Sequence, residues 1–142
     1  MAEAKFEKIT NSETLLYGLP KLLICGFPKS AQSKFMSLIA SAGLAAIPLI
    51  WATKAHSTAV LSELMRLPDG TGLGESSDLP RAVIVSGIQE KQLHVLMTLC
   101  RKTGLQPALW AVLTPISVEW TLQALLSELQ AERKAMQRKR KR

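Results

Sequence analysis

The sequence predicts an α/β protein made of two βαβα repeats, which are related by a pseudo-twofold and form one small, mostly parallel sheet flanked by helices. Two observations lead to this prediction. Residues 21–65 and 82–126 come into register without a gap when the chain is shifted by 61 positions, and eight of the 45 aligned pairs are identical. In both copies an apolar run stops at a glycine, a helical pattern ends in Gly-Leu, and a second apolar run follows.

Each element follows from local residue types. The runs at 22–25 and 83–86 are almost continuously apolar, as in strands buried on both faces. The next segments, 31–42 and 93–100, carry an apolar stripe at helical spacing and are expected to end in a Schellman cap at the Gly-Leu pair. Second strands are expected at 47–53 and 108–114, parallel to the first by a right-handed crossover. Final helices are expected at about 57–67 and from about 118 into the tail.

The expected organisation is a single domain. Repeat one spans residues 21–66, repeat two spans 81–132, and 133–142 form a basic tail. Residues 67–80, which contain three glycines and two prolines, are expected to be a flexible linker. No element is assigned to residues 1–20.

An uncharged run of nineteen residues, 35–53, is long enough to suggest a membrane span. Its counterpart in the second copy contains Arg101 and Lys102, which are costly in hydrocarbon. A helix followed by a strand explains both copies, so no transmembrane segment is expected. The N-terminus lacks the apolar region of a signal peptide, and Cys25 and Cys100 have no CxxC spacing. The expected location is the cytoplasm.

The most distinctive local pattern lies at residues 111–129, AVLTPISVEWTLQALLSEL. Pro115 ends a strand, and Ser117 is expected to be the N-cap of the following helix. Together with VIVSGIQEKQL at 83–93, this block resembles the bacterial family known as domain of unknown function 3783, over about residues 82–132. Residues 21–66 resemble the degenerate N-terminal half of complete members. The sequence departs from the family pattern at Ser117, where members have asparagine, and at Ile88, where they prefer an aromatic residue. The resemblance implies the architecture and no activity.

No chemistry-bearing motif is complete. The turn at 26–30, GFPKS, lacks the first glycine of a P-loop. His56 and His94 have no converging acids or cysteines, so no metal, cofactor or catalytic residue is expected. Ligands of open α/β sheets bind beyond the carboxyl ends of the strands, at a switch in strand order. That rule predicts a cleft between the repeats, and the residues just past the strand ends are Phe27, Lys29, Thr53, Lys54, Gln89, Thr114 and Pro115.

The net charge of +7 is concentrated at the C-terminus. Residues 133–142 hold seven basic side chains and no acid, so the other 132 residues hold eleven of each sign. Such a tail can bind phosphate backbones or anionic lipid, or can simply be a solvated helix end. The candidate polyanion-binding residues are Arg133, Lys134, Arg138, Lys139, Arg140, Lys141 and Arg142.

The leading hypothesis is a non-catalytic binding or regulatory module that recognises a protein or a small ligand. One alternative is a nucleic-acid-associated accessory protein that uses the basic tail. A second alternative is an unrecognised enzyme with a site in the cleft between the repeats. The sequence does not predict the oligomeric state.

Overall fold

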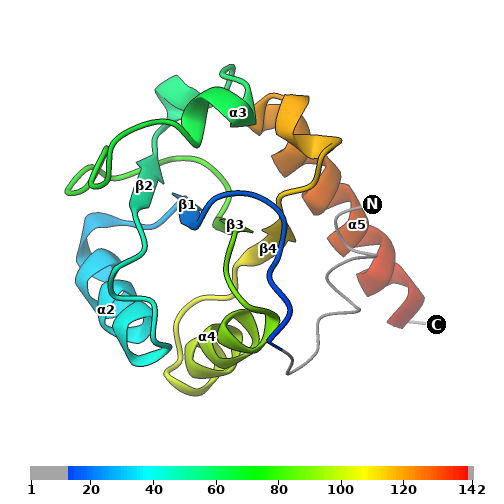
Figure 1. The fold of residues 1–142 in the computed structure, drawn as a ribbon. Helices are drawn as coiled ribbons and strands as arrows, with labels where there is room; N and C mark the ends of the chain where they lie inside the picture. The colour runs from blue at the N-terminus through cyan, green and yellow to red at the C-terminus, as the bar shows by residue number, and fades with distance from the viewer. Residues whose placement is uncertain (1–12, 141–142) are drawn as a thin grey trace.

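A computed structural model describes residues 13–140, with the exception of the Arg140 side chain. Its centre is one four-stranded sheet in the order β2-β1-β3-β4 (Figure 1). The strands are β1 (Lys21–Cys25), β2 (Leu49–Ala52), β3 (Ala82–Ser86) and β4 (Leu109–Val112). β1 pairs with β2 and β3 pairs with β4 in parallel, whereas β1 and β3 are antiparallel. The α/β class is confirmed, but the sheet is mixed rather than mostly parallel.

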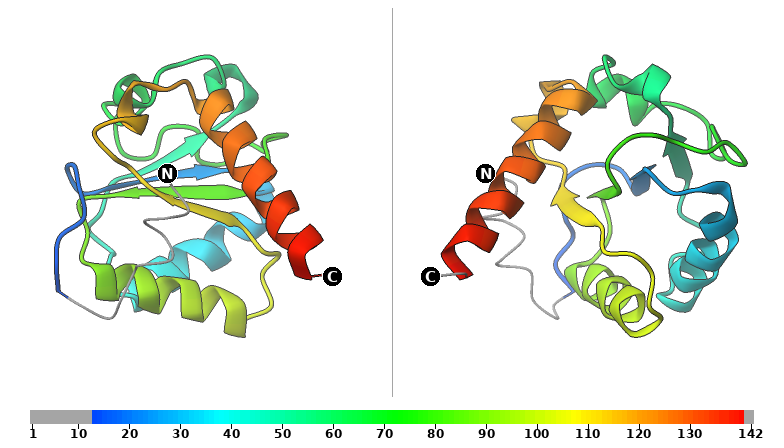
Figure 2. Two further views of the ribbon diagram at one scale, coloured as in Figure 1. Left: turned by 90° about the vertical axis from the view of Figure 1, so that its right-hand side faces the viewer. Right: turned by 180° about the vertical axis from the view of Figure 1, so that it is seen from behind.

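Helices cover both faces of the sheet (Figure 2). The helices α2 (Lys29–Ser41) and α4 (Glu90–Lys102) pack on one face, while α3 (Leu61–Leu64) and α5 (Leu122–Arg140) pack on the other. Because alternate residues of a strand point to opposite faces, each strand contributes to two separate apolar clusters. Leu23 and Ile84 belong to the cluster under α3 and α5, and their neighbours Leu22 and Val83 belong to the cluster under α2 and α4.

The two halves of the sheet meet at β1 and β3, where Leu23 lies opposite Ile84. A second antiparallel contact between the halves lies outside the sheet, where Val60 forms an isolated bridge with Thr121. Both pairs join residues that are 61 positions apart, which is the shift that aligns the two copies of the sequence.

Helix α3 is shorter than the predicted span of 57–67. Leu61 N–H donates to the Trp120 carbonyl at 2.9 Å, and Leu122 N–H donates to the Ala59 carbonyl at 3.0 Å. These bonds hold the backbone around Val60 extended, as its φ of −76° and ψ of 142° show. A helix therefore cannot begin before Leu61.

The uncharged run at 35–53 is a helix end followed by a strand, as expected. Helix α2 ends at Ser41, and Gly43 has a φ of +83°. Gly43 N–H bonds to the Ala40 carbonyl and Leu44 N–H bonds to the Ile39 carbonyl, both at 3.0 Å, which is the Schellman pattern. Strand β2 then begins at Leu49. Among residues 13–140, no helix has both the length and the apolar character that crossing a membrane requires.

The connector between the halves runs along the outer edge of β2. Leu49 N–H donates to Asp69 Oδ1, and Trp51 N–H donates to the Thr71 carbonyl, both at 2.8 Å. Gly72 has a φ of +78°, and a Cβ atom there would lie 2.0 Å from the Trp51 carbonyl oxygen, so only glycine fits this close approach. The connector thus supplies hydrogen-bond partners to an edge strand that would otherwise be bare.

Candidate functional site

The predicted cleft between the repeats is not formed, because the antiparallel junction sends the strand ends in opposite directions. Cys25, the last residue of β1, lies opposite Ala82, the first residue of β3. One end of the sheet therefore carries Phe27, Lys29, Thr53 and Lys54. The other end carries Gln89, Thr114 and Pro115. The seven predicted residues are therefore divided between two ends of the sheet, and their role in ligand binding stays a prediction.

Phe27 is a core residue. Its ring stacks on Phe35 with centroids 4.6 Å apart, meets Trp51 edge-on at 6.4 Å, and is almost fully buried. Its outer face supports the guanidinium of Arg81, which lies 4.4 Å from the ring centroid. Partial burial lowers the pKa of Arg81 from its usual value. At the same end of the sheet, Lys29 begins α2 and is exposed.

The two predicted threonines close the turns that follow β2 and β4. Thr53 N–H donates to His56 Nδ1 at 2.9 Å. Thr114 N–H donates to Ser117 Oγ at 3.0 Å, and Ser117 N–H donates back to Thr114 Oγ1 at 2.9 Å. Both threonines therefore have a local structural role, and the exposed Lys54 follows the first of them at the start of a 3₁₀ turn.

Ser117 is buried in its turn and does not cap α5, contrary to the prediction. Helix α5 begins five residues later, at Leu122, and Thr121 Oγ1 accepts the Ala124 N–H at 3.2 Å. Ser117 Oγ instead accepts hydrogen bonds from the backbone N–H and from the hydroxyl of Thr114. The strand-to-helix junction contains a 3₁₀ turn, Ser117–Glu119, that the sequence pattern did not reveal.

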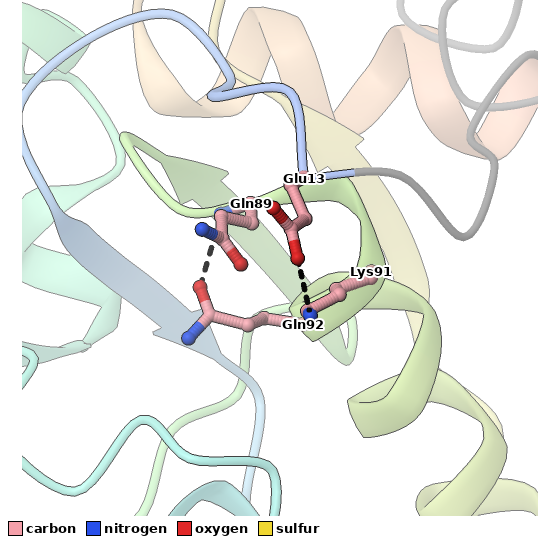
Figure 3. A network of polar contacts seen from close by, with 4 residues as sticks. All are labelled: Glu13, Gln89, Lys91 and Gln92. Atoms are coloured by element: carbon pink, nitrogen blue, oxygen red, sulfur yellow. Dashed lines mark hydrogen bonds and ion pairs between the residues drawn. The ribbon is translucent and has the colours of Figure 1, made fainter.

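Gln89 also serves its own helix, as Figure 3 shows. Its backbone N–H donates to Gln92 Oε1 at 3.0 Å at the start of α4, and nearby Lys91 pairs with Glu13 at 3.0 Å. Thr114 and Pro115 line a hollow of about 290 Å³ at this end of the sheet, beside residues 15–17.

A larger hollow lies at the opposite end, around the loop of residues 105–108 that connects α4 to β4. Its volume is about 650 Å³. We call it the arginine hollow, and its lining is Phe27, Met97, Cys100, Arg101, Leu105, Gln106, Pro107, Ala108, Trp110 and Arg133. Most of the lining residues are apolar, and the charged groups among them are two arginines and no acid.

Beside it lies a second depression of about 300 Å³, which shares Gln106, Pro107 and Arg133 with the arginine hollow. We call it the basic pocket, and its lining is Pro80, Arg81, Gln106, Pro107, Leu109, Gln130, Arg133, Lys134 and Gln137. Three side chains in this set are cationic, three are amides, and none is acidic.

The loop at 105–108 is held between two of these arginines. Arg81 Nη1 donates to the Gln106 carbonyl at 3.5 Å, and Arg133 Nη2 donates to the Ala108 carbonyl at 3.3 Å. On α4, Arg101 Nη2 donates to Thr98 Oγ1 at 3.3 Å. Within residues 13–140, none of the three guanidinium groups forms an ion pair with a carboxylate. Three cations thus line this region with neutral hydrogen-bond partners, and one carboxylate, Glu132, lines an adjoining depression that shares Arg133 with the arginine hollow.

The predicted polyanion-binding residues continue along α5. Arg133, Lys134, Arg138 and Lys139 are exposed on this helix, and the first two also line the basic pocket. The side chain of Arg140, together with Lys141 and Arg142, lies outside the described residues.

Comparison with known proteins gives one match. Residues 81–136 match the family model of the domain of unknown function DUF3783. The resemblance expected for residues 82–132 is therefore confirmed for this part of the chain. No curated protein and no solved structure matches the chain.

The DUF3783 region contains β3, α4, β4 and most of α5. It therefore includes the lining of the arginine hollow except Phe27, and the lining of the basic pocket except Pro80 and Gln137. Sequence analysis identified Phe27, Arg133 and Lys134 but did not single out Arg81, Arg101 or Trp110 as candidates. In the sequence, the only feature that marks these three residues is their position in or beside an element of the DUF3783 region. Residues in such positions usually serve the local helix or strand, so they were not recognised as ligand-binding candidates.

Proposed function

We propose that residues 21–66 and 81–132 are repeats related by a pseudo-twofold axis. Where two repeats meet at a twofold axis, a residue close to the axis lies opposite the equivalent residue of the other repeat. The pairing of Leu23 with Ile84, and of Val60 with Thr121, supports this relation at two separate places, because both pairs are 61 residues apart. Such an axis also accounts for the antiparallel contact between halves that are each internally parallel.

We further propose that the protein is a non-catalytic binding module, and that an anionic ligand with an apolar portion binds in the arginine hollow. The observation that carries this proposal is the pair Arg101 and Arg133, which lie beside an apolar lining that contains no acid. Small-ligand sites are typically hollows of 300–1,000 Å³ with an apolar lining and a few polar groups that fix orientation. The volume of the arginine hollow, about 650 Å³, lies within that range.

Charge favours an anion over a neutral ligand. A guanidinium is planar and pairs with a carboxylate or a phosphate through two parallel hydrogen bonds. Arg133 uses Nη2 on the Ala108 carbonyl, and this bond orients the side chain toward the loop. An anion between Arg101 and Arg133 would compensate two positive charges that have no carboxylate partner within residues 13–140.

The test uses benzoate and its neutral analogue benzamide as probes. Trp110 lines the hollow, so its indole resonance in a ¹H–¹⁵N spectrum is expected to shift on titration with benzoate and much less with benzamide. Arg101→Gln is expected to weaken benzoate binding about tenfold, which is typical for the loss of a charge-assisted hydrogen bond. Lys102→Gln is the matched control, because Lys102 is the exposed neighbour of Arg101 and lines neither hollow. Equal responses to the two probes would contradict the proposal.

The exposed cations of α5 support a second candidate function, an accessory protein that contacts nucleic-acid phosphates. Binding of a DNA duplex is then expected to weaken with salt, with a slope of about −0.9 per neutralised phosphate in a plot of log K against log salt. A chain that ends at Gln137 keeps Arg133 and Lys134 in the basic pocket but loses the five basic residues 138–142. Its slope is expected to be much shallower. An unchanged slope would refute this second function.

A further inference from the structure

We propose that the basic pocket binds the phosphoryl group of a small phosphorylated ligand, whose apolar or aromatic body lies in the adjoining arginine hollow. This inference rests on the proposed binding function and specifies its ligand class. It follows from the donor set of the pocket, from the way that set is held, and from the connection between the two hollows.

The donor set is richer than one carboxylate requires. It consists of three cations and three side-chain amides: Arg81, Arg133, Lys134, Gln106, Gln130 and Gln137. A carboxylate has two oxygens and one negative charge. A phosphoryl group has three terminal oxygens and a charge of about −1.5 to −2 at pH 7, so it can use more donors and compensate more of the positive charge.

Arg81 is held in place before any ligand arrives. Its guanidinium lies 4.4 Å from the centroid of the Phe27 ring, and Nη1 bonds to the Gln106 carbonyl. Phe27 is itself fixed by stacking on Phe35. A donor that is already ordered loses less conformational entropy on binding, and therefore contributes more to affinity. The remaining N–H groups of Arg81 stay available to an anion in the pocket.

The residues that the two depressions share indicate where the rest of the ligand would lie. Gln106, Pro107 and Arg133 line both depressions, so a phosphoryl group in the basic pocket has the apolar hollow next to it. Trp110 is partly exposed and lines this hollow, and an aromatic ring of the ligand would stack on it. A phosphomonoester with an aromatic ring matches both parts.

The experiment titrates the full chain at pH 8 and low salt with phenyl phosphate, inorganic phosphate, benzoate and phenol, followed by calorimetry and by the Trp110 indole resonance. Phenyl phosphate is expected to bind at least about tenfold more tightly than each of the other three, because it alone fills both depressions. Binding is expected to weaken as the pH falls through about 6, where the phosphoryl group takes up its second proton.

The matched variants are Arg133→Gln and Arg138→Gln, which remove the same charge from the same exposed helix. Only Arg133 lines the basic pocket. Arg133→Gln is expected to weaken phenyl phosphate binding about tenfold, whereas Arg138→Gln is expected to change it less than about twofold. Lys134→Gln provides a second test of the pocket, since this residue is exposed and lines it.

The outcomes separate the two proposals. If benzoate equals phenyl phosphate in affinity and Lys134→Gln has no effect, the phosphoryl assignment is overturned and the anion-binding function stands. If no anion shifts the Trp110 resonance, both proposals fail. If a DNA duplex displaces phenyl phosphate, and Arg138→Gln weakens the binding of both, the basic pocket is part of a nucleic-acid-binding surface and the small-ligand proposal is wrong.

Discussion

Two glycines with the same backbone conformation allow a quantitative test of how the halves fit together. Gly26 and Gly104 both have a φ of +76°. A Cβ atom on Gly26 would lie 2.4 Å from the Leu79 carbonyl oxygen and 2.7 Å from Arg81 N, whereas a Cβ atom on Gly104 would have nothing within 4 Å. Alanine at either site must adopt the left-handed conformation, but only at Gly26 must the backbone also move.

The two contributions add up differently. The left-handed conformation costs a residue with a Cβ about 1 kcal/mol. Forcing atoms into a filled site costs about 1–3 kcal/mol more. We therefore expect Gly104→Ala to lower the free energy of unfolding by about 1 kcal/mol and Gly26→Ala by about 3 kcal/mol. For a chain of this size, these losses correspond to a fall in Tm of roughly 3 °C and 10 °C.

Urea unfolding followed by far-ultraviolet circular dichroism measures both losses. The slope of free energy against urea should stay constant, since neither substitution changes the surface that unfolding exposes. Equal losses for the two variants would show that the chain preceding β3 does not press against Gly26, and the arrangement of the two halves described above would then be wrong.

Three further predictions concern the same framework. Gly87→Ala is expected to lower the free energy of unfolding in urea by about 3 kcal/mol, as much as Gly26→Ala. The reason is that its Cβ would lie 2.3 Å from Pro20 N and 2.4 Å from the Leu19 carbonyl carbon. A loss as small as that of Gly104→Ala would contradict the pseudo-twofold. Ser117→Ala leaves the buried Thr114 N–H without its acceptor and should lower the free energy of unfolding by about 1–3 kcal/mol. Ser117→Asn restores a side-chain oxygen and should recover much of this loss in a thermal melt. Equal melting points for the two variants would refute the turn geometry. Burial raises the pKa of Cys25 from 9.0 to about 12, so the unfolded chain loses this proton at lower pH than the folded chain does. The stabilisation is complete below about pH 9 and is lost as the pH rises toward 12, by at most about 1.4 kcal/mol per pH unit, and Cys25→Ala should remove that part of the pH dependence.

Most elements could be predicted because their signals are local. The apolar runs before Gly26 and Gly87 are buried on both faces, and they are the two central strands. The Gly-Leu pair at Gly43 ends α2 in the expected cap. These features depend on residue type and spacing along a few turns of chain, and both are visible in the sequence.

The direction in which the halves meet could not be read in the same way. No residue of β1 or β3 specifies whether its neighbour is parallel or antiparallel, since an apolar strand suits both arrangements. The length of α3 was mispredicted for a similar reason. The backbone at Val60 is extended because it pairs with the distant Thr121, and this pairing has no local signal in the sequence. The residues predicted to share a cleft lie at two ends of the sheet for this reason, although the strands themselves were placed to within one or two residues at each end.

The arginine hollow was missed because its parts come together only in three dimensions. Arg101 stands in the last turn of α4, where a cation is favoured by the helix dipole whether or not a ligand binds. Arg133 belongs to a run of basic residues that first suggests a solvated tail. Only the packing of α5 beside the loop at 105–108 brings Arg133 next to Ala108, and this packing has no local signature.

The position of β3 in the sheet has a consequence for any protein that consists of the matched region alone. The family model covers β3 and β4 but not β1, although β1 provides one whole side of the hydrogen bonding of β3. A protein limited to the matched region would therefore present a bare, greasy strand to water along five residues. Two such molecules would cover it by pairing their β3 strands antiparallel about a twofold axis, in the way that β1 and β3 pair in this chain.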